Sequence, residues 1–130
     1  IGTYKIVPWE YKKTTKEAID DIKSKVKSQK LKFEVKSQKQ EKKLQVTGYR
    51  LQVLAVEQHK NSIPYTKADY RFPLALVFGN ESFGVKEETL RLCDKIVEIP
   101  MHGINKSLNV IVAAGIVSYW VIAHQNFLQD

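Results

Sequence analysis

The sequence predicts an α/β domain in which a mostly parallel sheet carries helices on both faces. Two short stretches, Leu51–Val56 and Leu74–Phe78, are almost continuously apolar, as strands buried on both faces are. Helical patterns alternate with these stretches, and such alternation is typical of parallel sheets. The chain has 130 residues, 43% of them hydrophobic, which suits one domain with a packed core.

The sequence of the N-terminal part predicts a strand followed by a helix. Thr3–Val7 is β-branched and apolar, and Pro8 stops it, so we expect a strand end or an edge segment there. Thr14 and Glu17 form a capping box, which predicts a helix over about residues 15–25.

The later elements follow the two apolar strands. Lys86–Leu92 has a short helical pattern, and Ile96–Ile99 is a third predicted strand, which Pro100 stops. Ser107 is the expected N-cap of a long apolar helix that runs to about Gln125.

The positive charge is concentrated in one tract. The net charge is +7, yet the stretch from Lys23 to Arg50 alone holds ten basic and two acidic residues, a local charge of +8. The rest of the chain is therefore almost neutral. Within this stretch, residues 26–46 are rich in lysine, glutamine and serine and repeat the pattern Val-Lys-Ser-Gln-Lys, which favours either a flexible segment or an extended solvated helix.

Cysteine, histidine and hydropathy exclude several classes of protein. Cys93 is the only cysteine, so no disulfide forms within the chain, and a cytosolic setting is expected. His59, His102 and His124 lack the spacing of metal ligands, and no metal site is predicted. No apolar run approaches the ~18–20 residues of a membrane helix, so no membrane partner is expected.

The first chemically informative loop follows the strand Leu74–Phe78. Its turn carries Glu81 between two glycines, Gly79 and Gly84, at the carboxyl end of a predicted parallel strand. Ligands of open parallel sheets bind at such ends, and glycine lets the backbone approach them closely. A plain strand-to-helix turn has the same pattern, and the two readings stay equally open.

The second informative loop joins Ile99 to the last helix. The helix start presents free backbone N–H groups beside the side chains of Ser107 and Asn109, an arrangement that binds polar ligands readily. The alternative is that Ser107 is only an N-cap and Asn109 only a residue of the first turn.

Together the two loops resemble a known family. The segments LVFGNESFGV (76–85) and IPMHGINKSLNVIVAAGI (99–116) are similar to the second and third motifs of the SpoU (TrmH) RNA ribose 2′-O-methyltransferases of the SPOUT superfamily. The segments VPWE (7–10) and AVEQ (55–58) also resemble family sequence. The similarity covers residues 1–25 and 47–125, and the tract between, about 26–46, is interpreted as an insertion in this one catalytic domain.

The resemblance implies a fold, a cofactor and a set of site residues. In this family the C-terminal half forms a deep trefoil knot, a rare exception to unknotted folds, and the methyl donor is S-adenosyl-L-methionine. The implied cofactor contacts come from strand ends and from the start of the last helix: Val56, Gly79, Ile99, Ser107 and Leu108. The implied catalytic positions beside the reacting ribose are Asn109, Glu81 and Ser107.

The resemblance also implies partners. The substrate is tRNA or rRNA, and the sequence Ser107-Leu108-Asn109 is the variant found in enzymes that methylate ribose, which disfavours methylation of a base nitrogen. Family members are homodimers that pack through the C-terminal helix, so Tyr119 and Trp120 are the expected dimer anchors.

One family feature is absent from this sequence. The first motif, with the arginine usually assigned to proton transfer, has no counterpart here, and we expect it upstream of Ile1 in a longer protein. The alternative is a catalytically inactive, RNA-binding homologue that lacks the first motif.

The basic tract generates a testable prediction. If it contacts RNA phosphates, replacing Lys36, Lys39, Lys42 and Lys43 with neutral residues weakens RNA binding and flattens its dependence on salt. Titrations of RNA binding at several salt concentrations measure both effects. An unchanged slope would mean that the tract is only solvated.

Overall fold

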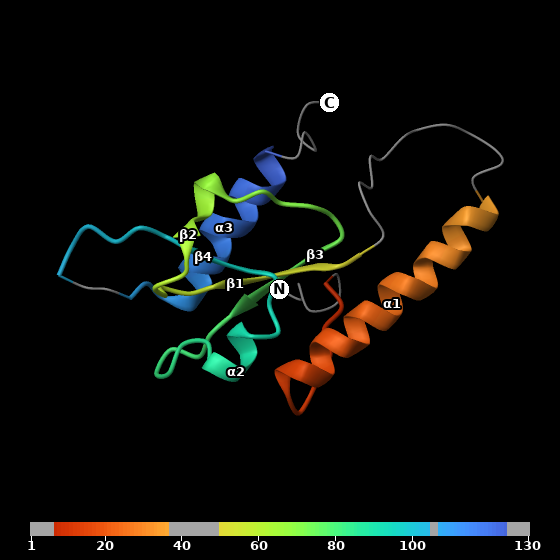
Figure 1. Cartoon of the computed structure of the whole chain (residues 1–130), viewed down its shortest axis with the longest axis horizontal. Coiled ribbons are helices and arrows are strands. Elements are labelled where there is room, and N and C mark those ends of the chain that lie inside the picture. The colour runs from red at the N-terminus through yellow and green to blue at the C-terminus, as the bar shows by residue number, and fades with distance from the viewer. Residues whose placement is uncertain (1–6, 37–49, 105–106, 125–130) are drawn as a thin grey trace.

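The computed structural model describes residues 7–36, 50–104 and 107–124 (Figure 1). Short connections link most of its elements. In chain order these are α1 (Thr15–Lys36), β1 (Gln52–Val56), β2 (Ile63–Pro64), a 3₁₀ helix (Tyr65–Lys67), β3 (Leu74–Phe78), α2 (Glu87–Leu90), β4 (Lys95–Glu98) and α3 (Val110–His124).

The four strands form one parallel sheet in the order β2-β4-β1-β3. Strand β1 is central, and its residue Val56 is in register with Phe78 of β3 and Val97 of β4. The predicted parallel sheet is therefore confirmed. Because the strands are parallel, the carboxyl ends of β1, β3 and β4 meet at the same edge of the sheet.

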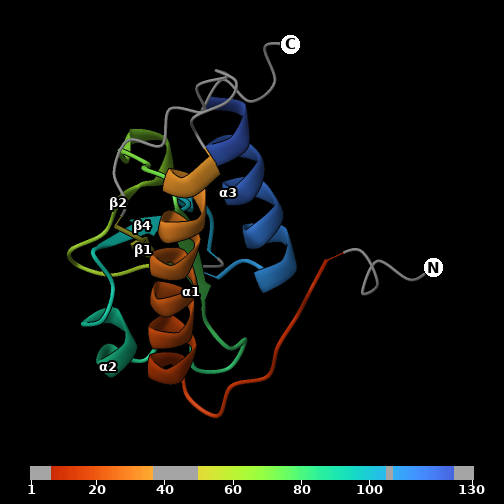
Figure 2. The ribbon, with the colours of Figure 1, turned by 90° about the vertical axis from the view of Figure 1, so that its right-hand side faces the viewer.

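Helices cover both faces of the sheet, as the sequence predicts (Figure 1, Figure 2). On one face, Val117 and Val121 of α3 pack with the fully buried Leu54 and Val97. On the other face, Ile19 of α1 packs with Leu51 and Val53, while Val85 and Leu90, beside and in α2, pack with Ala55. Strand β1 contributes side chains to the hydrophobic core on each face of the sheet, because successive strand residues point to opposite faces.

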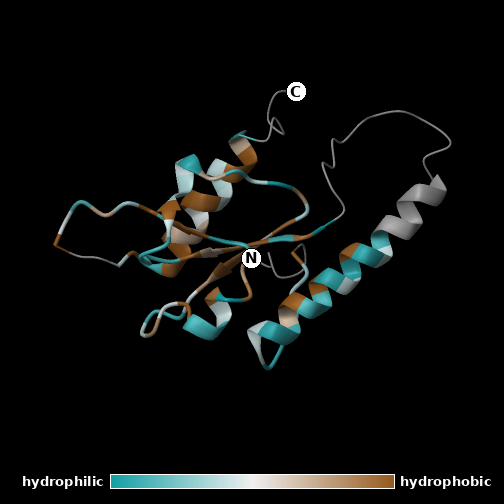
Figure 3. Ribbon diagram, viewed as in Figure 1, coloured by the Kyte–Doolittle hydropathy of each residue, from teal (hydrophilic) through white to brown (hydrophobic). Residues whose placement is uncertain are grey.

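The hydropathy of the residues differs between the elements of these layers. Hydrophobic residues follow the strands and α3, whereas the part of α1 that is coloured is mostly hydrophilic (Figure 3). No helix in the described part of the chain is long and apolar enough to cross a membrane.

Helix α1 begins where the capping box predicts. The N–H of Glu17 donates to Thr14 Oγ1 at 3.1 Å. The predicted end near Lys25 is wrong, because α1 continues to Lys36 and Val26 still packs on the cluster around Leu51. The first part of the predicted insertion is therefore helical, in line with the high helix propensity of lysine and glutamine, and residues 37–49 lie outside the described residues.

The start of the last helix corrects the predicted N-cap. Helix α3 begins at Val110, and the Asn109 side-chain oxygen accepts the N–H of Ile111 at 2.9 Å and that of Val112 at 3.4 Å. Asn109, not Ser107, is the N-cap. Both residue types cap well, but the apolar helical run begins directly after Asn109.

Two further differences concern short segments. Strand β2 was not predicted, since two residues are too few to give a periodic signal. The predicted strand Thr3–Val7 lies outside the described residues except for Val7, which is exposed.

Candidate functional site

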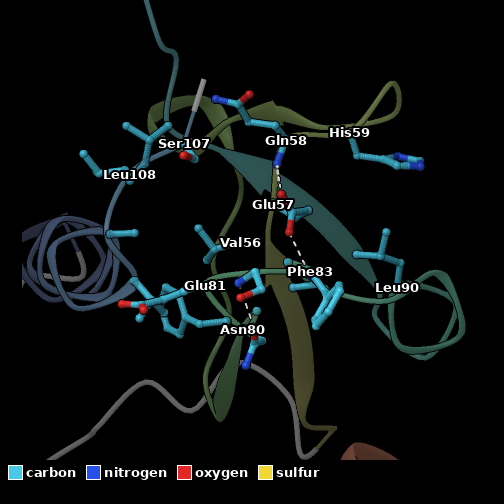
Figure 4. A pocket seen from close by; sticks show the side chains of 18 of the residues that line it. Val56, Glu57, Gln58, His59, Asn80, Glu81, Phe83, Leu90, Ser107 and Leu108 are labelled. Atoms are coloured by element: carbon cyan, nitrogen blue, oxygen red, sulfur yellow. Dashed lines mark hydrogen bonds between the residues drawn. The ribbon is translucent and has the colours of Figure 1, made fainter. Parts of the chain in front are cut away.

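A cavity of about 600 Å³ opens at the carboxyl ends of β1, β3 and β4 (Figure 4). Its walls come from the segments that follow these strands and from the start of α3. Cavities of roughly 300–1,000 Å³ are typical of small-molecule sites. The sheet topology thus creates one ligand-sized cavity where the strands end.

The residues predicted to contact a cofactor line this one cavity. They come from three strand ends and from the segment before α3, namely Val56, Gly79, Ile99, Ser107 and Leu108. Of the predicted catalytic residues, Glu81 and Ser107 line it as well. Asn109 does not line it, but its side-chain N–H donates to Glu81 Oε1 at 3.3 Å. The fold brings all the predicted positions together, and the role of each remains a prediction.

The turn that carries Glu81 is closed by its own hydrogen bonds. The Gly84 N–H donates to the Asn80 carbonyl at 2.8 Å, the Asn80 N–H donates to the Gly84 carbonyl at 3.2 Å, and the Ser82 N–H donates to Asn80 Oδ1 at 2.8 Å. The loop is therefore a tight turn, and it also lines the cavity.

Both glycines of the turn are required by its geometry. A Cβ at Gly79 would lie 2.2 Å from the backbone carbon of Gly84. Gly84 has φ +62°, and a Cβ there would lie 2.3 Å from Glu57 Oε2. A larger side chain at Gly79 forces the backbone to move, whereas one at Gly84 strains the backbone through its positive φ and displaces the Glu57 carboxylate.

Glu57 is a structural residue of the site that the sequence did not identify. Its Oε2 accepts the Val85 N–H at 2.7 Å, and its Oε1 accepts the Gln58 N–H at 2.9 Å (Figure 4). Its own N–H donates to the carbonyl of Val97 at 2.9 Å. Glu57 therefore connects the end of β1 with β4 and with the turn after β3. The only signal in the sequence is an acid directly after a buried strand, which is also common in solvated turns.

The loop between β1 and β2 is fixed in a similar way. Ser62 Oγ lies 2.8 Å from Glu98 Oε2 and 2.6 Å from the His59 carbonyl, and the Asn61 N–H donates to His59 Nδ1 at 3.1 Å. His59 Nε2 lies 3.7 Å from Glu87 Oε2. These contacts hold His59 at the cavity rim.

Apart from His59, the ionisable side chains that line the cavity are acidic. Glu57, Glu81 and Glu87 line it, and its described lining includes neither lysine nor arginine. No cluster of metal-ligating side chains is found in residues 7–36, 50–104 and 107–124. Such a cavity favours a cationic ligand over a phosphate.

The fold and the cavity define a class: an α/β domain with a ligand-sized cavity at the carboxyl ends of parallel strands. The family follows from the sequence. A model of the SpoU rRNA Methylase family matches residues 11–119, and the chain belongs to this family. The resemblance seen in the two motif loops is thereby confirmed.

Individual proteins that are similar to this chain are RNA methyltransferases. A tRNA (guanosine(18)-2′-O)-methyltransferase of Aquifex aeolicus is 40% identical over 79 residues, which cover 61% of this chain and 37% of the relative. The AdoMet-bound rRNA methyltransferase of Sinorhizobium meliloti matches at 33% identity and TM-score 0.54, over 57% of this chain and 28% of that one. The chain thus spans well under half the length of these relatives.

A third comparison concerns the fold. The SpoU methyltransferase AviRb of Streptomyces viridochromogenes matches 95% of this chain and 41% of its own with TM-score 0.70. Its sequence identity is only 22%. The shared fold therefore extends over nearly the whole chain.

The glycine geometry predicts the effect of two matched substitutions. Gly84→Ala destabilises the domain, because it combines a positive φ with a clash against Glu57. Gly115→Ala, in α3 where a Cβ meets nothing within 4 Å, stabilises the domain by about 0.5–1 kcal/mol. Thermal unfolding measures both changes. Equal melting temperatures for Gly84→Ala and the unmodified chain would contradict the described turn.

Proposed function

We propose that this chain binds S-adenosyl-L-methionine in the cavity and serves in the methylation of a ribose 2′-hydroxyl of tRNA or rRNA. The observation that carries the proposal is the convergence of the predicted cofactor positions, together with Glu81, on one cavity. Family membership and the relatives named above support it.

The residues present suit this cofactor. Val56, Ile99 and Leu108 offer apolar walls, and the neighbouring carboxylates suit a positively charged ligand. When bound, S-adenosyl-L-methionine supplies an electrophilic methyl group on a positively charged sulfur. The strand-end loops position the ligand, which lowers the entropic cost of bringing two reactants together.

The pair Glu81 and Asn109 occupies the edge of the cavity nearest α3. Both side chains are exposed, and the Asn109 amide joins the turn after β3 to the first turn of α3. We assign to Glu81 the orientation of the ribose hydroxyl, since a carboxylate accepts a hydrogen bond from it. The hydrogen bond from Asn109 holds Glu81 in place, and Ser107 also lines the cavity.

We also propose a homodimer that packs through α3. One side of the helix packs on the domain core, whereas the other exposes a continuous apolar stripe of Ile111, Val112, Ile116, Tyr119 and Ile122. Trp120 packs on the chain's own core and meets the ring of Tyr65 edge to face at 5.5 Å. Tyr119, 69% exposed, is therefore the better dimer anchor.

Two further properties that the family resemblance implies belong to this proposal. The trefoil knot of the C-terminal half and the cytoplasmic location stay predictions. A cytoplasmic location accords with an RNA substrate and with a chain that has a single cysteine.

Cofactor binding is tested with a matched pair of leucines. Leu108 and Leu92 are both 37% exposed, but only Leu108 lines the cavity. We expect saturable binding of S-adenosyl-L-methionine in calorimetry, a loss of more than about tenfold in affinity for Leu108→Arg, and little change for Leu92→Arg. Absence of binding to the unmodified chain would refute the proposal.

Methyl transfer is tested separately with labelled cofactor and either tRNA or rRNA, followed by mass spectrometry of the nucleosides. The expected product is a 2′-O-methylated nucleoside. Cofactor binding without transfer would instead support the non-catalytic RNA-binding alternative.

The dimer has its own test. Ile111→Asp places a charge on the exposed stripe, and we expect it to convert a dimer to a monomer in light scattering. Val7→Asp, at a residue 65% exposed outside α3, is the control and leaves the mass unchanged. A monomeric unmodified chain would contradict the proposed interface.

A further inference from the structure

Phe83 is an exposed aromatic residue at the rim of the cavity. Its side chain is 82% exposed, although it lines the same cavity as Glu81. The other residues at the tip of this turn, Asn80, Glu81 and Ser82, are polar. In Figure 4, Glu81 lies on the side of the turn that faces α3, and Phe83 lies on the side that faces Leu90 of α2. The turn thus presents a carboxylate and an aromatic ring on two different sides.

The turn holds Phe83 in a fixed position. The hydrogen bonds between Asn80 and Gly84 close the turn, and the bond from Val85 N–H to Glu57 fixes its base. An aromatic side chain has only two rotatable bonds, so a ring on such a support loses little conformational entropy on binding a partner.

The charges on either side of the turn indicate what kind of partner the ring suits. On one side lies the acidic cavity, with Glu57, Glu81 and Glu87. On the other lies a second cavity of about 590 Å³, whose lining includes the exposed side chains of Lys13, Lys16 and Lys86 and one acid, Glu88. Lys16 is paired with Asp20 at 2.6 Å, so Lys13 and Lys86 carry most of the positive charge offered to a ligand. Residues Phe78–Asn80, Gly84 and Val85 line both cavities, so the turn is the wall between them.

A nucleotide strand fits this arrangement. Its phosphates are attracted by lysines and repelled by carboxylates, whereas its bases are neutral and planar. Single-stranded RNA is commonly recognised by stacking of unpaired bases on exposed aromatic rings. A strand that crosses the turn can therefore place a base on Phe83 and its phosphates toward the lysines.

We propose that Phe83 is a stacking platform for an unpaired base of the RNA substrate, next to the nucleotide whose ribose is methylated. This inference rests on the proposed function and names a residue that positions its substrate.

The test compares Phe83 with Tyr11, an aromatic residue 81% exposed that lines neither cavity. The probe is an unmodified, fluorescein-labelled tRNA transcript, or an rRNA fragment if that is the RNA the unmodified chain binds. We expect Phe83→Ala and Phe83→Leu to weaken RNA binding about tenfold, because leucine keeps an apolar side chain but has no aromatic face. Phe83→Trp retains RNA binding, and Tyr11→Ala leaves RNA binding unchanged.

A spectroscopic readout separates stacking from a structural role. In Phe83→Trp the added tryptophan is expected to lose fluorescence when RNA binds, whereas in Tyr11→Trp it does not. Full RNA affinity in Phe83→Leu, or an equal change of fluorescence in Phe83→Trp and Tyr11→Trp when RNA binds, would overturn the proposal while leaving the proposed function intact. An unmodified chain that binds neither RNA nor cofactor would overturn both.

Discussion

The carboxylate of Glu57 is the interaction on which the site depends. It accepts hydrogen bonds from the backbone of Gln58 and Val85, while its own N–H donates to Val97. Three strand ends that are distant in sequence are thereby held in one arrangement. The requirement for glycine at position 84 follows, because a Cβ there would collide with this carboxylate. A buried backbone N–H left without an acceptor costs about 1–3 kcal/mol, so loss of the carboxylate would release the turn.

The molecule separates charges of opposite sign. Acidic side chains line the cavity at the strand ends, whereas Lys13, Lys16 and Lys86 line the second cavity on the other side of the turn. In the proposed function these regions have different ligands: the cavity takes the positively charged cofactor, and lysines outside it meet RNA phosphates. The turn around Phe83 lies between the cavity and one group of lysines. This separation prevents the two ligands from competing for one set of charges.

Much of this arrangement could be predicted from local sequence. The strands β1, β3 and β4 lie within one or two residues of their predicted ranges, because proline, glycine or a change in polarity bounds each apolar run. Other features depend on contacts between distant residues. Glu57 fixes the turn by accepting the N–H of Val85, which lies 28 positions away in the sequence. Residue type alone did not distinguish Asn109 from Ser107 as the N-cap, since both side chains are good caps.

Cofactor affinity in two glutamate variants tests the central role of Glu57 most directly. Calorimetry with S-adenosyl-L-methionine would compare Glu57→Ala with Glu87→Ala, since both glutamates line the cavity but only Glu57 accepts the Val85 N–H. We predict that Glu57→Ala lowers the affinity at least about tenfold with an unchanged circular dichroism spectrum, and that Glu87→Ala has a much smaller effect. Unchanged affinity in a folded Glu57→Ala chain would contradict the account.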